Sequence, residues 1–335
     1  MKLTIQPAIR CLLIASASAL SALGQSSSPS TIIGAGYLLP TPLNVAPGQI
    51  ITVFAAGVGS NLTQPVFAGA GNWPTSLAGI GVTIRQGTDI PAPIFEVNPL
   101  TACSGCAAIT AITVQIPYGL FTACGPSLMV CSNSNVLVLT EYFVTDNGVA
   151  GALSQLNPLP DQVHILTVCD TVLPGGSGYV PGDGLPCQPE VAHADGTLVS
   201  NMNPAFTGEE LVAYAVGLGA TNPAVPTGQP AAKPVPTAQT FGLDFNFHPD
   251  ALASKPFPSN VLPIGYQPPV PLFTGLTPRY PGLYQINFAV PGVPAGLAPC
   301  APGDGPGLVN TNLTVSVGGS ASFDGAGICV SLPEP

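Results

Sequence analysis

Residues 281–292 of the chain read PGLYQINFAVPG. Every second side chain near the middle of this stretch is large and apolar: Tyr284, Ile286, Phe288 and Val290. Alternation with a period of two is typical of a β-strand that covers a core with one face only. Pro281 and Pro291 stand at the two ends, where a missing backbone donor costs a sheet least. The stretch therefore predicts a core strand with these four apolar side chains on its buried face.

This strand has a counterpart earlier in the chain, as part of an internal repeat. Three pairs of segments match in the same order: 46–61 with 206–221, 90–95 with 268–273, and 113–117 with 287–291. The first pair aligns without a gap and brings Gly57 onto Gly217 and Gly59 onto Gly219. Segments that recur in one order indicate two copies of a single domain.

The composition favours strands over helices in both copies. The 335 residues include 40 prolines and 39 glycines, and each proline inside a helix removes a backbone donor and clashes with the preceding turn. Short alternating strands broken by turns predict an all-β chain of two tandem β-sandwiches. We expect residues 31–148 to form the first sandwich, residues 149–189 a Gly/Pro-rich connection closed by a disulfide, and residues 190–335 the second sandwich.

The first 24 residues have the order of a secretory signal peptide. Lys2 and Arg10 precede an apolar run over 11–20, and small residues surround Gly24. The run is shorter than the about 20 apolar residues that cross a bilayer, and no later run of that length lacks breaks. We therefore predict cleavage after Gly24, a secreted, cell-surface or periplasmic location, and no membrane insertion of the mature chain.

The charge of the chain argues against nucleic acid as a partner. Only 7% of the residues are charged, and the formal net charge is −10. Without Lys2 and Arg10, four basic residues stand against 16 acidic ones, which gives a net charge of −12 for the mature chain. Nucleic acids and anionic membranes are repelled by such a surface.

The cysteines predict disulfides. One of the nine, Cys11, lies in the signal peptide, and the remaining even number is typical of disulfide bonding in an exported chain. The alternative for Cys103 and Cys106 is half of a zinc site or a redox motif, but the sequence offers neither a second pair with knuckle spacing nor a βαβ unit. We expect four local pairs: Cys103 with Cys106, Cys124 with Cys131, Cys169 with Cys187, and Cys300 with Cys329.

Three segments of the second copy resemble a family of exported bacterial proteins that is abundant in Acidobacteria of the Solibacter type. The segments are 193–219, 270–296 and 313–319, and the first copy is a weaker match. That family is defined by an uncharacterised domain, usually found at the C-terminus. The resemblance implies immunoglobulin-like β-sandwiches, similar to IPT or TIG domains, in secreted or surface proteins, and it implies no activity. The additional cysteines and the Pro-rich insertion over 227–240 depart from the family pattern.

The sequence contains no catalytic motif for hydrolysis. A Gly-x-Ser-x-Gly elbow is absent, and the three histidines, His164, His193 and His248, lie far apart in the sequence. His193 with Asp195 is the pair that an enzyme hypothesis would depend on. We predict a chain without catalytic residues and without a cofactor.

Paired acidic residues support neither glycoside hydrolysis nor a metal site. Glu209 and Glu210 are adjacent, so on a strand they face opposite ways and cannot flank one bond. Asp244 and Asp250 lie six residues apart without the loop that calcium sites use. No metal is predicted.

Exposed aromatic rings are the remaining candidates for ligand contact. A platform of two or three rings binds a glycan, whereas single scattered rings cover the edges of a core. Rings in loop-like settings of this chain are Trp73, Tyr118, Tyr179, Tyr266 and Tyr280.

The sequence thus predicts a non-catalytic exported protein that acts as an extracellular or cell-surface binding or adhesion module. Its partner is expected to be a polysaccharide or a cell-envelope protein. Two alternatives stay open: a secreted hydrolase with a site between the two domains, and a structural subunit of an envelope layer.

Overall fold

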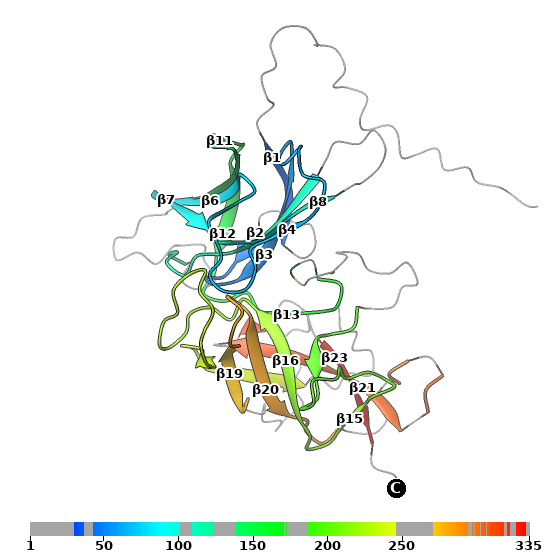
Figure 1. Cartoon of the computed structure of the whole chain (residues 1–335). Coiled ribbons are helices and arrows are strands. Elements are labelled where there is room, and N and C mark those ends of the chain that lie inside the picture. Colours follow the sequence, from blue (N-terminus) through cyan, green and yellow to red (C-terminus); the bar gives the residue numbers. More distant parts are fainter. Residues whose placement is uncertain are drawn as a thin grey trace, which may run out of the picture.

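A computed structural model shows two stacked β-sandwiches (Figure 1). It describes residues 30–36, 43–100, 109–122, 139–170, 172, 187–245, 271–293, 297, 299–301, 303–305, 307–317, 320–321 and 326–332. Within these ranges all regular structure is strand, so the predicted all-β class is confirmed. No helix in the described part of the chain is long and apolar enough to cross a membrane. The signal peptide, Cys103, Cys106, Cys124, Cys131, Tyr179, His248, Asp250 and Tyr266 lie outside the described residues.

The first sandwich is built from two sheets that enclose an aliphatic core containing Ile51, Val82 and Val114. One sheet has the order β1 (Thr31–Gly36), β3 (Ile50–Ala56), β9 (Ile109–Gln115), β8 (Ile94–Leu100) and β4 (Val66–Phe67). The facing sheet has the order β2 (Leu43–Val45), β12 (Ser154–Pro158), β10 (Thr140–Asp146), β6 (Ile80–Gln86) and β5 (Ser76–Leu77), with β11 (Val149–Ala150) on β10 and β7 (Thr88–Ala92) on β6.

The second sandwich repeats this arrangement around Leu211, Phe288 and Ile328. Its first sheet has the order β13 (His164–Ile165), β16 (Glu210–Val216), β20 (Tyr284–Ala289), β19 (Phe273–Leu276) and β17 (Val235–Pro236), with β14 (Val191–Ala192) on β16. Its facing sheet has the order β15 (Ala205–Phe206), β23 (Ala326–Ser331), β21 (Leu308–Val317) and β18 (Phe241–Phe245), with β22 (Ser320–Ala321) on β21.

The strand order is that of the immunoglobulin fold, in which strands A, B, E and D form one sheet and C, F and G the other. The first sheet of each sandwich supplies the A, B, E and D strands: β1, β3, β9 and β8, and then β13, β16, β20 and β19. The facing sheets supply C, F and G: β6, β10 and β12, and then β18, β21 and β23. The predicted pair of tandem immunoglobulin-like sandwiches is therefore confirmed.

The repeated segments take equivalent places in the two sandwiches. The first pair includes β3 and β16, and the third pair includes the last three residues of β9 and of β20. Ile50 is opposite Gln115 in the first sandwich, and the aligned residues Glu210 and Ala289 are opposite each other in the second. The same register in both copies is the structural counterpart of the sequence repeat.

The core strand predicted from residues 281–292 is β20. The side chains of Tyr284, Ile286 and Phe288 are fully buried, and Gln285 between them is only partly buried. Pro281 lies before the strand and Pro291 after it, so neither interrupts the pairing with β16.

The expected connection over 149–189 contributes strands to both sandwiches. β11 and β12 complete the facing sheet of the first sandwich, and β13 pairs with β16 in the second. The passage between the sandwiches is therefore the short segment from the end of β12 to the start of β13. Strands of two to five residues carry too little alternation for sequence patterns to place them.

Candidate functional site

The two sandwiches share a small apolar cluster at their junction. Trp73 and Ile50 of the first sandwich pack there with Leu166 and Val216 of the second. Only 7% of the Trp73 surface is exposed, and its ring lies 5.1 Å from that of Phe95. The Trp73 backbone N–H also donates to the carbonyl of Gly228 at 2.9 Å. The junction is thus a packed interface.

Buried polar side chains add specific contacts to this junction. Gln115 accepts from the N–H of Gly228 at 2.6 Å and donates to the carbonyl of Gly48 at 3.3 Å. The Tyr118 hydroxyl lies 3.1 Å from that of Tyr284, which donates to a backbone carbonyl of its own sandwich. Burial raises the pKa of Tyr118 to about 12, so this pair stays neutral at physiological pH.

A glycine allows a close approach between the sandwiches. Gly282 has φ = 70°, and a β-carbon there would lie 2.5 Å from the Gly48 carbonyl oxygen and 2.9 Å from Gln115 Nε2. Only glycine fits such a position without strain and displacement. Because the contact is made by backbone atoms, it fixes the relative placement of the two sandwiches.

Next to this junction lies a groove formed by two adjoining cavities, which we call the junction groove. The wider cavity has a volume of ≈ 570 Å³, and the narrower one has a volume of ≈ 130 Å³. They share Leu166, Tyr280 and Leu283. The wider cavity is also lined by Glu190, Tyr214, Thr277, Pro278 and Gln285, and the narrower one by Ile50, Trp73, Phe95 and Val172. The volume of the wider cavity is within the range of about 300–1,000 Å³ that small-molecule sites occupy.

Neighbouring strands supply the floor of the junction groove. Tyr214 on β16 is directly opposite Gln285 on β20, and both side chains are partly buried. Because side chains alternate along a strand, Gln285 faces the groove while its neighbours Tyr284 and Ile286 fill the core. The groove is therefore built on the outer face of a rigid sheet.

The turn between β19 and β20 supplies the wall. Thr277 is 5% exposed, and its hydroxyl oxygen has no hydrogen-bond partner among the described residues. Three residues later, Tyr280 is 54% exposed. A buried hydroxyl without a partner costs about 1–3 kcal/mol, so a hydrogen-bond partner at Thr277 would stabilise this wall.

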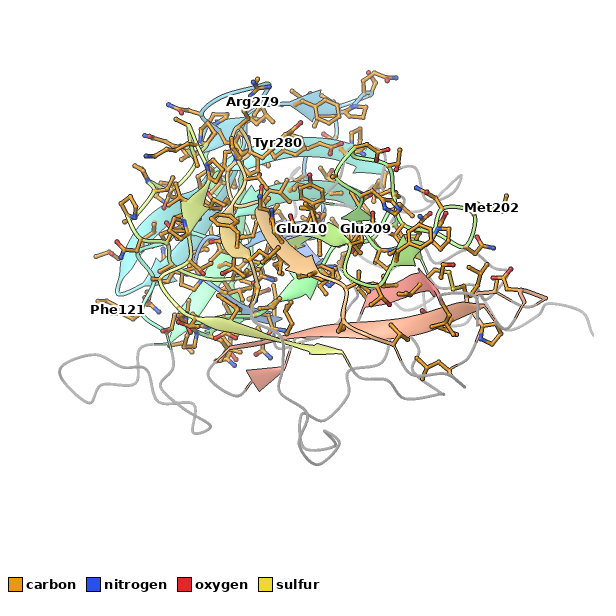
Figure 2. All side chains as sticks on the ribbon, turned by 90° about the horizontal axis from the view of Figure 1, so that it is seen from below. Phe121, Met202, Glu209, Glu210, Arg279 and Tyr280 are labelled. Atoms are coloured by element: carbon orange, nitrogen blue, oxygen red, sulfur yellow. A yellow bond between two sulfur atoms is a disulfide. The ribbon has the colours of Figure 1, made fainter. Side chains whose placement is uncertain are left out.

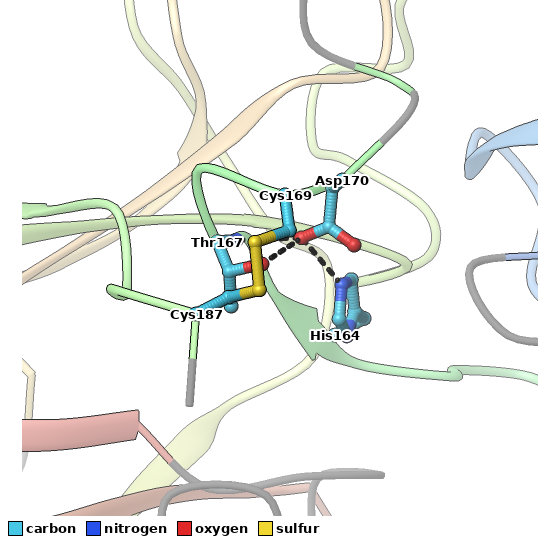
Figure 3. Close-up of a disulfide and its surroundings, with 5 residues drawn as sticks. All are labelled: His164, Thr167, Cys169, Asp170 and Cys187. Carbon is cyan, nitrogen blue, oxygen red and sulfur yellow. Dashed lines mark hydrogen bonds and ion pairs between the residues drawn. A yellow bond between two sulfur atoms is a disulfide. The ribbon is translucent and has the colours of Figure 1, made fainter. Parts of the chain in front are cut away.

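A disulfide between Cys169 and Cys187 (Figure 3) lies three residues before Glu190 in the chain. The Glu190 N–H donates to the Leu166 carbonyl at 2.7 Å. Burial raises the pKa of Glu190, and the nearby charge of Asp170 raises it further. The predicted pairs Cys169–Cys187 and Cys300–Cys329 are both present in the structure.

Asp170 is held behind this disulfide by three contacts. Its carboxylate accepts from the N–H of Thr167 at 2.6 Å and from the Thr167 hydroxyl at 3.1 Å, and it lies 3.0 Å from His164 Nε2 (Figure 3). The Thr167 hydroxyl thus faces the aspartate and not the histidine. A nucleophile would need the opposite order, with its hydroxyl on the imidazole.

The aromatic residues proposed from sequence have different surroundings. Tyr280 forms a wall of the junction groove, and Trp73 lines its narrow end. Tyr118 lies in the junction between the sandwiches. Three lining residues, Glu190, Thr277 and Gln285, were not singled out in the sequence. Gln285 has the pattern of any outward residue on a strand, and Glu190 and Thr277 lie outside the strands.

The pair His193 and Asp195 does not form the arrangement that hydrolysis would need. His193 Nδ1 lies 2.5 Å from a Glu209 carboxylate oxygen, and His193 Nε2 lies 3.1 Å from the Asn203 carbonyl. Asp195 instead accepts from the backbone and hydroxyl of Thr197. Both imidazole nitrogens are therefore occupied by acceptors. Within the described ranges, no group of three or more His, Cys, Asp or Glu side chains could hold a metal ion.

The same histidine predicts a pH dependence of stability. Burial opposes its charge, but the hydrogen bonds to Glu209 and Asn203 outweigh burial, so the pKa of His193 is raised above 6.5. A group with a raised folded-state pKa stabilises the fold below its unfolded pKa, and this contribution is lost as the pH rises through the folded pKa. We expect the melting temperature to fall as the pH rises from the unfolded-state pKa of His193 to its folded-state pKa. This decline should be absent in His193→Gln. An identical decline in the variant would assign it to other groups.

Comparisons with known proteins identify no family. No protein-family model matches the chain, and no curated protein matches its sequence. Among solved structures, InvD of Yersinia pseudotuberculosis is 11% identical with a TM-score of 0.19, and the match covers 90% of this chain and 57% of that one. The tandem immunoglobulin repeats of Dlar are 11% identical with a TM-score of 0.18, covering 91% and 100%. Bovine butyrophilin is 10% identical with a TM-score of 0.20, covering 88% and 96%.

Proposed function

We propose that this protein is a non-catalytic, extracellular or cell-surface binding module that holds its ligand in the junction groove. The observation that carries the proposal is the hydroxyl of Thr277, which has no hydrogen-bond partner in the described part of the chain, on the same groove wall as the exposed ring of Tyr280. A concave site with a few convergent polar groups on a rigid support is the usual form of a ligand site. The expected ligand is a polysaccharide or a cell-envelope protein.

An oxidising compartment fits this proposal. Two disulfides are formed between cysteines of the described ranges, and such bonds persist in exported proteins. Together with the signal-like first 24 residues, they support export. Membership of the acidobacterial family of exported proteins is part of the same proposal, and it rests on the sequence resemblance alone.

The proposal is tested by binding measurements on the purified protein and on Tyr280→Ala. The wild type is expected to bind a glycan or an isolated cell envelope, and the variant to bind it about tenfold more weakly, because it loses the stacking surface. Phe206→Ala is the matched control, since Phe206 is 58% exposed and is not among the residues that line the groove. Equal binding by wild type and Tyr280→Ala would remove the groove as the site. Hydrolysis of any polymer in the same measurements would contradict the non-catalytic assignment.

A further inference from the structure

We propose that the junction groove binds a neutral saccharide, with one pyranose ring against Tyr280 and its hydroxyls on Thr277, Gln285 and Glu190. This inference rests on the proposed function, because it names the ligand class of the same groove.

The lining has the two-sided character of a sugar ring. A pyranose presents apolar C–H groups on its faces and hydroxyls around its rim. Tyr280 offers an exposed aromatic face, and Leu166 and Leu283 provide an apolar surface between the two cavities. An amphipathic tyrosine ring is suited to contact with such a face.

The polar groups combine donors and acceptors, as hydroxyls require. The Thr277 hydroxyl both donates and accepts, an ionised Glu190 carboxylate accepts, and the Gln285 amide does both. One Gln285 N–H already donates to Asn287 Oδ1 at 3.0 Å, which orients the amide on the strand. Three different groups on one cavity match a ligand that carries several hydroxyls.

The charges around the groove favour a neutral ligand. Glu190 lines the cavity, and the charge of Asp170 is close enough to raise its pKa. An acidic polymer would meet the Glu190 carboxylate. Arg279, which is exposed, lies next to Tyr280 (Figure 2), and its charge opposes a cationic polymer there. Among the described residues that line the groove, Glu190 is the single charged one, so the lining has no charged patch that would select a charged chain.

The floor argues against an extended peptide. Peptides that bind by strand addition pair with a free sheet edge. Here the floor residue Gln285 lies on β20, which pairs with β16 on one side and with β19 on the other. Its backbone groups are taken up by these neighbours, so the groove offers side chains and no open ladder.

The test measures calorimetric binding of four probes to the full protein: a neutral glucan oligosaccharide, an oligogalacturonate, a chitosan oligosaccharide and a solubilised envelope-protein fraction. The neutral glucan is expected to bind with an affinity that hardly changes with salt, since charged ligands alone are screened. Tyr280→Ala should weaken it about tenfold, and Phe206→Ala should leave it unchanged.

Thr277→Val separates a ligand contact from a structural role. The variant removes a buried hydroxyl that has no partner, so the free protein should melt at a higher temperature, while saccharide binding weakens about three- to tenfold. Binding of an acidic, cationic or protein probe that depends on Tyr280, without binding of neutral glucan, would overturn the saccharide inference and leave the groove intact as a site. If Tyr280→Ala binds every probe as tightly as the wild type does, both the saccharide inference and the groove as the binding site are overturned.

Discussion

Gly282→Ala is expected to separate the two sandwiches without unfolding either of them. The new β-carbon would lie 2.5 Å from the Gly48 carbonyl oxygen, at a backbone φ of 70°. Left-handed geometry alone costs a residue with a β-carbon about 1–2 kcal/mol, and the clash with backbone atoms adds to it. Because the clash lies across the junction, the junction is expected to yield first. The radius of gyration from small-angle scattering should rise while the circular dichroism of the strands is retained.

Two other glycines make this experiment specific. Gly208 has φ = 84° but no atom within 4 Å of a β-carbon, so Gly208→Ala carries the backbone strain without the clash. Gly292 has neither the positive φ nor a neighbour, so Gly292→Ala carries neither effect. We expect Gly292→Ala to have the highest melting temperature, Gly208→Ala a lower one and Gly282→Ala the lowest. The radius of gyration should increase only in Gly282→Ala. A compact Gly282→Ala with the scattering profile of the wild type would contradict a backbone-fixed junction.

Phe288→Ala is expected to cause the largest loss of stability that one side chain of the second sandwich can produce. Phe288 is fully buried on β20, within the core that includes Leu211 and Ile328. Removing a buried phenylalanine side chain costs about 3–5 kcal/mol, because apolar contacts are lost and a cavity is left. The free energy of unfolding, measured by denaturant titration with the disulfides intact, should fall by that amount.

An exposed phenylalanine of the same sandwich provides the control for this measurement. Phe206 is 58% exposed at the end of β15, and Phe206→Ala should change the free energy of unfolding by less than about 0.5 kcal/mol. A loss below about 1 kcal/mol for Phe288→Ala would mean that β20 is not the core strand that its alternation indicates.

The core of the fold was accessible to sequence reasoning because burial leaves a periodic pattern. The alternation over 281–292 corresponds to β20 with the predicted buried face, and the repeat over 46–61 and 206–221 corresponds to β3 and β16. The cysteine pairs of the described ranges were also predictable, since Cys169–Cys187 and Cys300–Cys329 each join neighbouring cysteines of the chain.

The groove was less accessible because it depends on contacts between segments far apart in the chain. Tyr280 stood out in the sequence as a ring in a loop. Glu190 and Gln285 gave no such signal, because they become part of a cavity only when the fold places Leu166 and Tyr280 around them. The junction likewise depends on a pairing of sandwiches that no local period encodes. Trp73 illustrates this: its burial is completed by residues more than ninety positions later, such as Leu166.

The parallel strand pairs determine how each sandwich would carry mechanical load. β2 runs parallel to β12 in the first sandwich, and β15 runs parallel to β23 in the second. In each case a strand near the start of the sandwich lies beside the strand that ends it, so tension applied at the two ends would slide one past the other. Their hydrogen bonds would then have to shear together, where a hairpin pulled from its open end unzips bond by bond. This arrangement converts tension into collective resistance.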